Sequence, residues 1–250
     1  MLVYGVEPTS ALAALAIGAH PDDVEISMGG TLALLTDRGY RVGVIDLTRG
    51  ETGSRGTPEQ RLEESRAAAG LLGVESRFNL ALPDGELAVT PEAVRALTRL
   101  VRLCRPAFVF THSGHDPHPD HAAARQLVHT ACHHAGLGRF DPGLAPHRPK
   151  YVFHFTHPHR ARPSFLVDIS AFWETKLRAI RCHQSQVSPR GAEEPDTYLG
   201  QSHFLQILES HAISLGAQVG ARYVEAFLSH GPLLVDDPLA AFGRKEGRLL

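Results

Sequence analysis

The sequence has few cysteines and little net charge. Only three of its 250 residues are cysteines; they are far apart and form no CxxC pair, which argues against a disulfide framework and a thiolate zinc site. Positive and negative charges nearly balance, with a formal net charge of −2, so neither nucleic acid nor anionic lipid is an expected partner. A small molecule is therefore the expected partner.

Long hydrophobic runs are also missing. The run from Ala11 to Ala19 is too short to span a bilayer, and no basic stretch of the kind found in signal peptides precedes it. We therefore expect no membrane association and a location in the reducing cytoplasm. The composition is that of an ordinary folded chain, and no linker or repeat divides it. One domain over residues 1–250 is expected.

Short hydrophobic runs alternate with amphipathic stretches along the chain. The pattern predicts strands at residues 11–18, 41–47, 78–82, 107–111, 151–155 and 165–169. It predicts helices at residues 24–37, 59–72, 91–104, 120–135, 170–183 and 203–220, with Asp120 as the N-cap of its helix. This alternation predicts an α/β fold: a Rossmann-like three-layer sandwich with a mainly parallel sheet, whose ligands bind beyond the carboxyl ends of the strands.

A polar cluster, Ala19-His20-Pro21-Asp22-Asp23, stands where the first expected strand ends. No G-x-G-x-x-G follows the strand, so the cluster is a poor candidate for dinucleotide binding. His20 and Asp23 are three residues apart, so both side chains can face one metal ion if a helix begins at Pro21. Asp22 would then lie beside the metal without having to bind it. The alternative is that Asp22 or Asp23 only caps the helix.

A second cluster, His118-Pro119-Asp120-His121, follows the fourth expected strand. A catalytic zinc typically has three protein ligands and keeps one position open, and His20, Asp23 and one histidine of this cluster would supply the three. Taken alone, the second cluster is more typical of a helix cap flanked by surface histidines. Its occurrence at another strand end favours a shared metal site. We interpret the nearby His112 and His115 as loop residues.

The sequence resembles the LmbE-like or PIG-L-type deacetylases of N-acetylglucosamine derivatives. Besides the two polar clusters, the resemblance includes Asp46-Leu47-Thr48, Gly56 to Arg61, Asn79-Leu80, Leu82-Pro83-Asp84, His147-Arg148 and Gly220 to Phe227. It covers most of the chain and is strongest for the bacterial branch that deacetylates N-acetylglucosaminyl-malate during bacillithiol synthesis. It implies hydrolysis of the N-acetyl amide of a small amino-sugar substrate.

By this resemblance, one zinc ion (Zn2+) per subunit is bound by His20, Asp23 and His121, and Asp22 is the general base. Zinc lowers the pKa of its bound water toward neutrality, and a neighbouring carboxylate can accept the proton as the water attacks the amide carbon. The expected chemistry is therefore coherent with the residue types.

The resemblance also assigns residues around the metal. His118, oriented by Asp120, would stabilise the oxyanion or protonate the departing amine. Arg61 and Arg148 would bind substrate hydroxyls or a carboxylate, and Tyr198 would reach the acyl oxygen. Without the resemblance, each arginine is most simply interpreted as a solvated surface residue.

Several alternatives remain at this point. The metal motifs act on the shared amide and do not separate N-acetylglucosaminyl-malate from another N-acyl sugar, such as a chitin disaccharide or a mycothiol-type conjugate. A non-catalytic sugar-binding or metal-storage protein on the same fold is a further alternative, against which Asp22 argues as a retained base. By resemblance, a homo-oligomer is expected, either a trimer or a hexamer.

Overall fold

Eight strands form one sheet in the computed structural model, which describes residues 2–5, 8, 10–114, 116–156, 162–188, 195 and 197–242. The strands are β1 (Leu2–Gly5), β2 (Ala14–Gly18), β3 (Val42–Thr48), β4 (Ser76–Leu82), β5 (Phe108–His112), β6 (Tyr151–Phe155), β7 (Phe165–Asp168) and β8 (Val224–Leu228). The helices are α1 (Asp23–Asp37), α2 (Pro58–Leu72), α3 (Pro91–Cys104), α4 (Pro119–Ala135), α5 (Trp173–Cys182), α6 (Gln184–Val187), α7 (Phe204–Ala217) and α8 (Pro238–Phe242).

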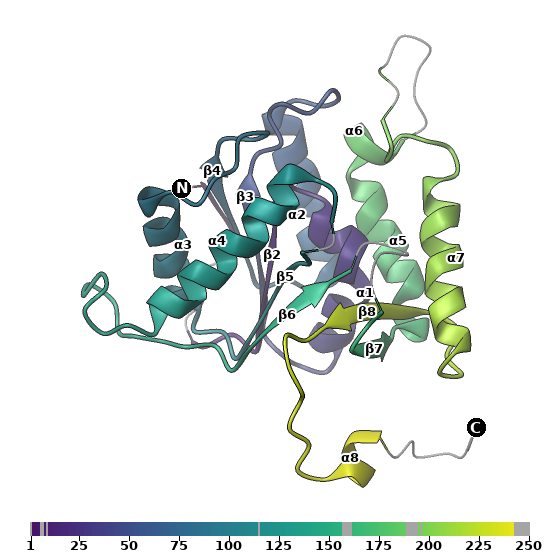
Figure 1. Ribbon diagram of the computed structural model, residues 1–250. Helices are drawn as coiled ribbons and strands as arrows, with labels where there is room; N and C mark the ends of the chain where they lie inside the picture. Colours follow the sequence, from purple (N-terminus) through teal and green to yellow (C-terminus); the bar gives the residue numbers. More distant parts are fainter. Residues whose placement is uncertain are drawn as a thin grey trace.

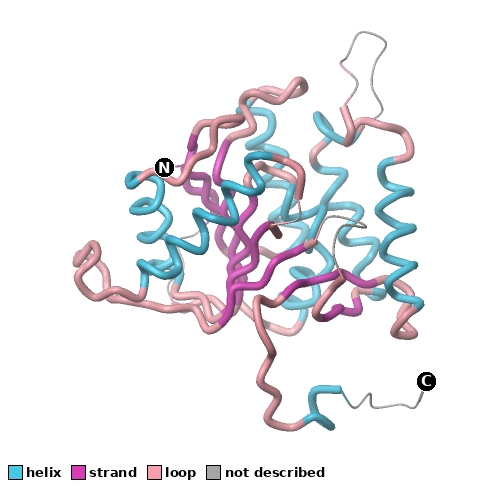
Figure 2. Tube along the Cα trace, viewed as in Figure 1, coloured by secondary structure: helices cyan, strands magenta, loops and turns pink. Residues whose placement is uncertain are grey.

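The order of strands across the sheet is β1-β4-β3-β2-β5-β6-β8-β7. The pairs β4·β3, β3·β2, β2·β5 and β5·β6 are parallel, whereas β1 is antiparallel to β4, and β8 is antiparallel to both β6 and β7. Helices lie on both sides of the sheet, as Figures 1 and 2 show. The predicted fold class, a three-layer α/β sandwich with a mainly parallel sheet, is confirmed.

The two faces of the sheet explain why β2 and β3 have continuous hydrophobic runs. Every residue of both strands is buried, as expected for parallel strands covered on both faces. Leu97 of α3 and Leu127 of α4 belong to the hydrophobic cluster on one face. Leu32 of α1 and Leu72 of α2 belong to the cluster on the other face.

Local sequence signals account for the ends of several helices. At α2 the Thr57 side chain accepts a hydrogen bond from Gln60 N at 3.2 Å, and Pro58 occupies the first helical position. Gly73 ends this helix in the left-handed conformation, with φ 67°, which glycine adopts without steric cost. The expected boundaries of this helix are therefore nearly those observed.

Other boundaries differ from the expectation. The N-cap of α4 is His118 and not Asp120: the His118 ring accepts a hydrogen bond from Asp120 N at 3.2 Å, and the Asp120 carboxylate points elsewhere. The helix expected at 170–183 is a 3-10 turn (Ser170–Phe172) followed by α5, and α6 begins just after it. The strands β1 and β8 and the helix α8 were not expected from the hydrophobic pattern.

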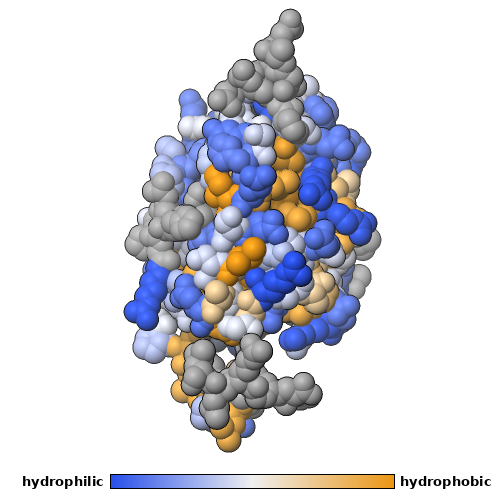
Figure 3. All heavy atoms as spheres, turned by 90° about the vertical axis from the view of Figure 1, so that its right-hand side faces the viewer, coloured by the Kyte–Doolittle hydropathy of each residue, from blue (hydrophilic) through white to orange (hydrophobic). Residues whose placement is uncertain are grey.

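The chain after β8 leads away from the sheet to α8, which stands apart from the other helices in Figure 1. Leu234 and Leu239 on this segment are 83% and 80% exposed. Figure 3 views the face that carries α7 and shows a mostly hydrophilic surface with several small hydrophobic patches. Within the described part of the chain, we find no helix with the length and apolar character needed to cross a bilayer.

Candidate active site

The two polar clusters meet at the carboxyl ends of β2 and β5. His20 and Asp23 follow β2, while His121 lies in the first turn of α4, which follows β5. Because β2 and β5 are parallel neighbours, both clusters emerge at the same edge of the sheet. They line a cavity of about 760 Å³, within the range typical of small-molecule sites.

The turn between β2 and α1 places the first cluster. Asp23 Oδ2 accepts a hydrogen bond from His20 N at 2.7 Å, and Asp22 O accepts one from Ile26 N at 3.0 Å, which begins the helix. Asp22 has φ 119°, a conformation that is strained for any residue with a Cβ. The strained turn therefore directs adjacent carboxylates to different partners.

The donor atoms of His20, Asp23 and His121 surround one point. Asp23 Oδ2 is 3.3 Å from His20 Nδ1, and Asp23 Oδ1 is 3.2 Å from His121 Nε2. Around a tetrahedral zinc with bonds of 2.0–2.1 Å, neighbouring donor atoms stand about 3.3 Å apart. The three residues therefore fit a zinc ion, and we identify them as the candidate metal-binding set.

Electrostatics at this point favours a cation. Burial lowers the pKa of His20, but Asp23 and other carboxylates outweigh burial and raise this pKa to about 11. Burial likewise opposes a charged His121, yet Asp23 raises its pKa to about 9. Burial raises the pKa of Asp23, whereas the nearby His121 and His112 hold it well below its ordinary value. The carboxylates thus stabilise positive charge where a metal ion would lie.

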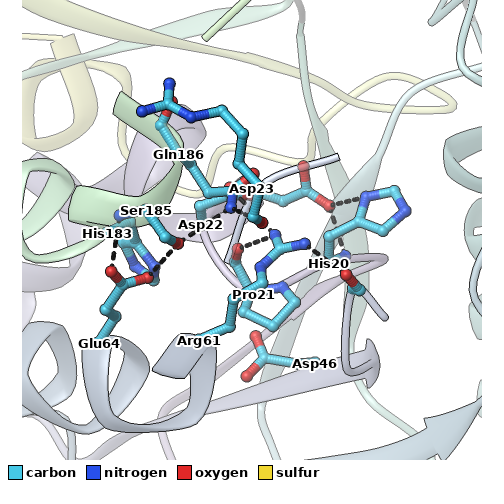
Figure 4. Close-up of polar contacts among 12 residues, drawn as sticks. His20, Pro21, Asp22, Asp23, Asp46, Arg61, Glu64, His183, Ser185 and Gln186 are labelled. Carbon is cyan, nitrogen blue, oxygen red and sulfur yellow. Dashed lines mark hydrogen bonds and ion pairs between the residues drawn. The ribbon is translucent and has the colours of Figure 1, made fainter. Parts of the chain in front are cut away.

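Asp22 faces a different partner from Asp23. Arg61 donates hydrogen bonds from Nη2 to Pro21 O at 2.8 Å and to Asp22 Oδ2 at 3.3 Å, and from Nη1 to Gly50 O at 3.0 Å. Figure 4 shows the Arg61 guanidinium directed at this turn. Burial raises the pKa of Asp22 to about 6, although Arg61 acts in the opposite direction. Asp22 is therefore a carboxylate beside the metal-binding set and not one of its three donors.

Two buried carboxylates near the site, those of Glu25 and Asp46, stabilise the fold. Glu25 of α1 and Asp46 of β3 both bind the buried Arg77 of β4; Arg77 Nε and Nη2 lie 2.8 Å from the two Asp46 oxygens. Burial raises the pKa of Glu25, but Arg77 and His183 outweigh burial and hold it far below its ordinary value. The ion cluster joins α1 to the sheet directly behind the metal-binding turn.

Comparison with known proteins agrees with this arrangement. Residues 15–132 match the family model described as GlcNAc-PI de-N-acetylase, PIG-L. Over 227 residues, 84% of this chain and 80% of the relative, the chain is 35% identical to the diacetylchitobiose deacetylase of Thermococcus kodakarensis. The chain belongs to the PIG-L deacetylase family.

The similarity extends beyond deacetylases. A 4-oxalmesaconate hydratase of Pseudomonas putida is 30% identical over 71% of this chain and 75% of its own. The crystal structure of the conserved protein TT1542 from Thermus thermophilus superposes with a TM-score of 0.82 at 38% identity, covering 90% of this chain and 97% of that one. Membership of the PIG-L family therefore leaves the reaction to be argued from the site.

His112 is a site residue of this PIG-L family chain that the sequence analysis misplaced. It is the last residue of β5, not a loop residue, and it is 2% exposed. Its Nε2 accepts a hydrogen bond from Ala19 N at 2.9 Å and lies 3.2 Å from Asp23 Oδ2, and its ring stacks on that of His121. The expected strand ended one residue too early. His115 lies outside the described residues.

Asp84 and Asp116 were not assigned a function from the sequence. Asp84 Oδ1 lies 3.1 Å from His20 Nε2, and Asp116 Oδ2 lies 2.8 Å from His121 Nδ1. Carboxylates on the outer nitrogens of metal-binding histidines fix the tautomer and the orientation of the ring. Asp84 stands in the Leu82-Pro83-Asp84 segment of the resemblance, which was the available signal.

Asp120 contacts the His118 ring through its backbone N–H, while its carboxylate has other partners. The carboxylate accepts hydrogen bonds from Gly85 N at 2.8 Å and Leu87 N at 3.2 Å, and it lies 3.2 Å from His20 Nε2. The backbone N–H of Asp120 donates a hydrogen bond to His118 Nδ1 at 3.2 Å, which positions the ring. The His118 ring lines the cavity, with its centroid 4.9 Å from that of His20.

Arg148 does not lie in the cavity, contrary to the expectation. It stands before β6, at the amino end of a strand parallel to β5, and its Nη2 donates to His133 O at 3.3 Å near the end of α4. His133 is twelve residues beyond His121, about 18 Å at 1.5 Å per helical residue. A residue preceding a parallel strand lies at the edge of the sheet opposite the site.

Tyr198 and Arg61 both line the cavity. Tyr198 is 46% exposed, and its ring packs edge-on against Phe204, with centroids 5.6 Å apart. The opposite wall comes from the second half of the chain: Trp173 and Lys176 of α5, Leu208, His211 and Ala212 of α7, and Glu225 of β8. The cavity is thus bounded by a metal-binding wall and a second wall of mixed polarity.

Proposed function

We propose that the chain is a zinc-dependent deacetylase that hydrolyses the N-acetyl amide of an N-acetylglucosamine derivative. The observation that carries the proposal is that the two adjacent carboxylates of the β2–α1 turn have different partners. Asp23 faces His20 and His121 at metal-ligand spacing, while the adjacent Asp22 faces the cavity and Arg61. A bound metal with a free carboxylate beside it is what hydrolysis of an amide by water requires.

Each step of this chemistry has a residue of this chain to perform it. A zinc ion held by the three donors would polarise the amide carbonyl and lower the pKa of the attacking water. Asp22, with a pKa of about 6, is ionised at neutral pH and can accept the proton of that water. Its contact with Arg61 keeps the carboxylate oriented while it does so.

His118 can act on the opposite side of the reacting carbonyl. Its Nδ1 accepts the hydrogen bond from Asp120 N, so a neutral His118 carries its proton on Nε2. Burial and the nearby His121 lower the pKa of His118, which keeps the ring neutral near pH 7. The Nε2–H group is then a hydrogen-bond donor for the developing oxyanion.

The expected substrate N-acetylglucosaminyl-malate came from the family resemblance, with Arg61 and Arg148 as the cations that would bind a carboxylate. In this structure Arg61 binds Pro21, Gly50 and Asp22, and Arg148 lies at the opposite edge of the sheet. We therefore propose a neutral N-acetylated disaccharide of glucosamine as the preferred substrate. The 35% identical diacetylchitobiose deacetylase supports this choice.

The decisive experiment offers the zinc-loaded protein three substrates: diacetylchitobiose, N-acetylglucosaminyl-malate and N-acetylglucosamine. Acetate and free amine are measured, and we expect the highest kcat/KM for diacetylchitobiose. A clear preference for the malate glycoside would restore the bacillithiol assignment. If no acetate forms from any substrate while 4-oxalmesaconate gains water, the protein is a hydratase and the proposal is wrong.

The expected homo-oligomer and cytoplasmic location stay predictions. The exposed Leu234 and Leu239 beyond β8 support this proposal of self-association, because a second copy that covered them would remove apolar surface from water. Light scattering of the wild type and of a Leu234→Ser, Leu239→Ser variant would measure this. A monomeric wild type would contradict the expectation of a trimer or hexamer.

A further inference from the structure

Three histidines meet outside the cavity described above. His129 comes from α4, His154 from β6 and His230 from the segment just after β8. One ring nitrogen of each lies within 4.8 Å of the others. We call these three residues the tri-histidine cluster. None of them lines the cavity that holds Asp22 and Asp23.

The rings are arranged with their nitrogens turned inward. His129 Nε2 and His154 Nε2 are 2.7 Å apart, and the two rings lie nearly parallel, with an interplanar angle of 16°. The His230 ring stands across both, at 69° and 80°, with its centroid 4.9 and 4.7 Å from theirs. A hydrogen bond between two imidazoles explains one of these contacts, but not the convergence of a third ring.

The cluster has room for a ligand beside it. His154 and His230 line a cavity of about 400 Å³ together with Ser113, Gly114, Arg125, Leu228 and Ser229. His154 is 3% exposed and His230 is exposed, so the cluster connects the interior with solvent. An ion could enter from the His230 side and retain water on the side of the cavity.

The surroundings keep imidazole lone pairs available. Burial, together with the neighbouring histidines and Arg125, lowers the pKa of His129 to about 4 and that of His154 to about 3. The His154 ring also makes a hydrogen bond with the Leu228 backbone, and such a bond fixes a metal-binding ring in place. Neutral imidazole is the form that binds metals.

We propose that the tri-histidine cluster is a second metal site, which binds a first-row transition ion of the zinc class through three imidazole nitrogens and leaves further positions to water. Three imidazoles without a carboxylate favour zinc, nickel or copper over magnesium or calcium, which prefer oxygen donors. The site is separate from the PIG-L metal set and does not depend on the proposed deacetylase activity. Its ion would tie α4, β6 and the segment after β8 to one another.

The Arg125 guanidinium would compete with a metal ion for His230. Its Nη2 lies 2.9 Å from His230 Nε2, so this guanidinium occupies a place where a metal ion would bind. The side chain must turn away when the ion enters, because two cations at this distance repel. Removal of its charge in Arg125→Ala should therefore tighten binding at the cluster while leaving the PIG-L site unchanged.

The test counts metal ions in the folded protein. Wild type and variants are loaded with excess zinc, freed of loose metal by gel filtration and analysed for zinc per chain. The wild type should hold two ions, and His129→Ala and His230→Ala should each hold one. The matched control His133→Ala, an exposed histidine on the same helix, should hold two. His121→Ala, which damages the PIG-L site, should keep the ion at the cluster.

Cobalt(II) provides a second readout in the same proteins. In His121→Ala, bound cobalt should give a visible absorption spectrum that His230→Ala, combined with His121→Ala, abolishes. The proposal is overturned if wild type holds a single ion, or if His129→Ala and His230→Ala both retain two. Loss of the second ion in Asp116→Ala but in neither cluster variant would place that ion in the first site and would also overturn it.

Discussion

At the scale of single residues, Asp22 and Asp23 show how adjacent carboxylates acquire different chemistry. Asp23 is surrounded by histidines, which hold its pKa well below its ordinary value. Asp22 is turned the other way by its unusual φ of 119°, and burial raises its pKa to about 6. One is suited to bind a cation and the other to exchange a proton.

Asp22→Asn should retain zinc and lose most turnover. Asparagine keeps the shape of the side chain and its contact with Arg61, but it is not a base, and positioned bases contribute about 10²–10⁴-fold to rates. Zinc content and kcat are measured on the same preparation. Loss of zinc, or near-normal turnover, would contradict the assignment of Asp22 as the base.

The pH profile tests the influence of Arg61 on Asp22. A base with a raised pKa is active above that pKa, so kcat/KM should fall as pH drops through the pKa of Asp22, at or below about 6 once a metal ion is bound. The Arg61 guanidinium lowers this pKa. Arg61→Met should therefore move the acidic limb to higher pH.

Arg148→Ala is the matched control for this profile, because Arg148 lies at the opposite edge of the sheet. Its profile and its kcat/KM should equal those of the wild type. An acidic limb that stays in place in Arg61→Met, or that moves in Arg148→Ala, would show that the two arginines have been assigned the wrong surroundings.

At the scale of elements, the bend in α1 explains a buried ion pair. Met28 has non-helical angles, φ −144° and ψ 21°, so the helix starts again after it. The N–H groups of Gly30 and Thr31 donate to the Glu225 carboxylate of β8 at 2.9 and 2.6 Å. Lys176 of α5 lies 2.6 Å from the same carboxylate. The Glu225 side chain thus joins α1, α5 and β8 at the wall of the cavity.

Glu225→Ala should lower the free energy of unfolding by about 3–5 kcal/mol, because it leaves the buried Lys176 ammonium without its partner. Urea unfolding followed by circular dichroism measures the change. The control is Glu63→Ala, which breaks the exposed pair with Arg66 and should cost at most about 1 kcal/mol. Equal decreases in the free energy of unfolding in both variants would contradict the stabilising role of the buried Glu225 ion pair.

Sequence patterns succeed for elements whose burial is regular. The strands β2 and β3 are buried on both faces, so their hydrophobic runs are unbroken and their helices follow at short intervals. The pattern fails for β8, because Glu225 interrupts a strand of only five residues. That glutamate satisfies a helix bend far away in sequence, and no local signal indicates such a partner.

The candidate site likewise contains residues that the sequence indicates and residues that it does not. His20, Asp23 and one histidine of the second cluster could be grouped from their spacing and from their positions after strands, and the family resemblance selected His121. His112 was missed because the end of a strand is not defined to one residue by hydrophobicity. Arg148 was placed in the site by likeness of short segments alone, whereas its position before a parallel strand already indicates the opposite edge of the sheet.

At the scale of the whole molecule, one sheet edge gathers donors that stand far apart in the sequence. Between Asp23 and His121 lie β3, β4 and β5, and the metal set exists only when β2 and β5 are paired. A metal ion that binds this set therefore binds the folded chain and not the unfolded one, which couples metal affinity to stability.

Removal of metal by a chelator should abolish acetate release and lower the melting temperature. At a free zinc concentration of about 100 times Kd, one bound ion contributes about 2.7 kcal/mol to the folded state. Calorimetry of metal-free and zinc-restored protein measures the difference, and acetate release should return with zinc. Full activity in demonstrably metal-free protein would contradict a metal-dependent reaction.

The two walls of the cavity come from consecutive parts of the chain, so the second part could be replaced by that of a relative. The metal donors and the base all precede residue 122, whereas Phe155 and the residues of α5, α7 and β8 line the facing side. A chimera that joins the first 135 residues of this chain to the second half of a relative should catalyse the reaction of this chain with the substrate preference of the relative. Recombination between relatives can therefore change the substrate specificity without changing the residues that carry out the reaction.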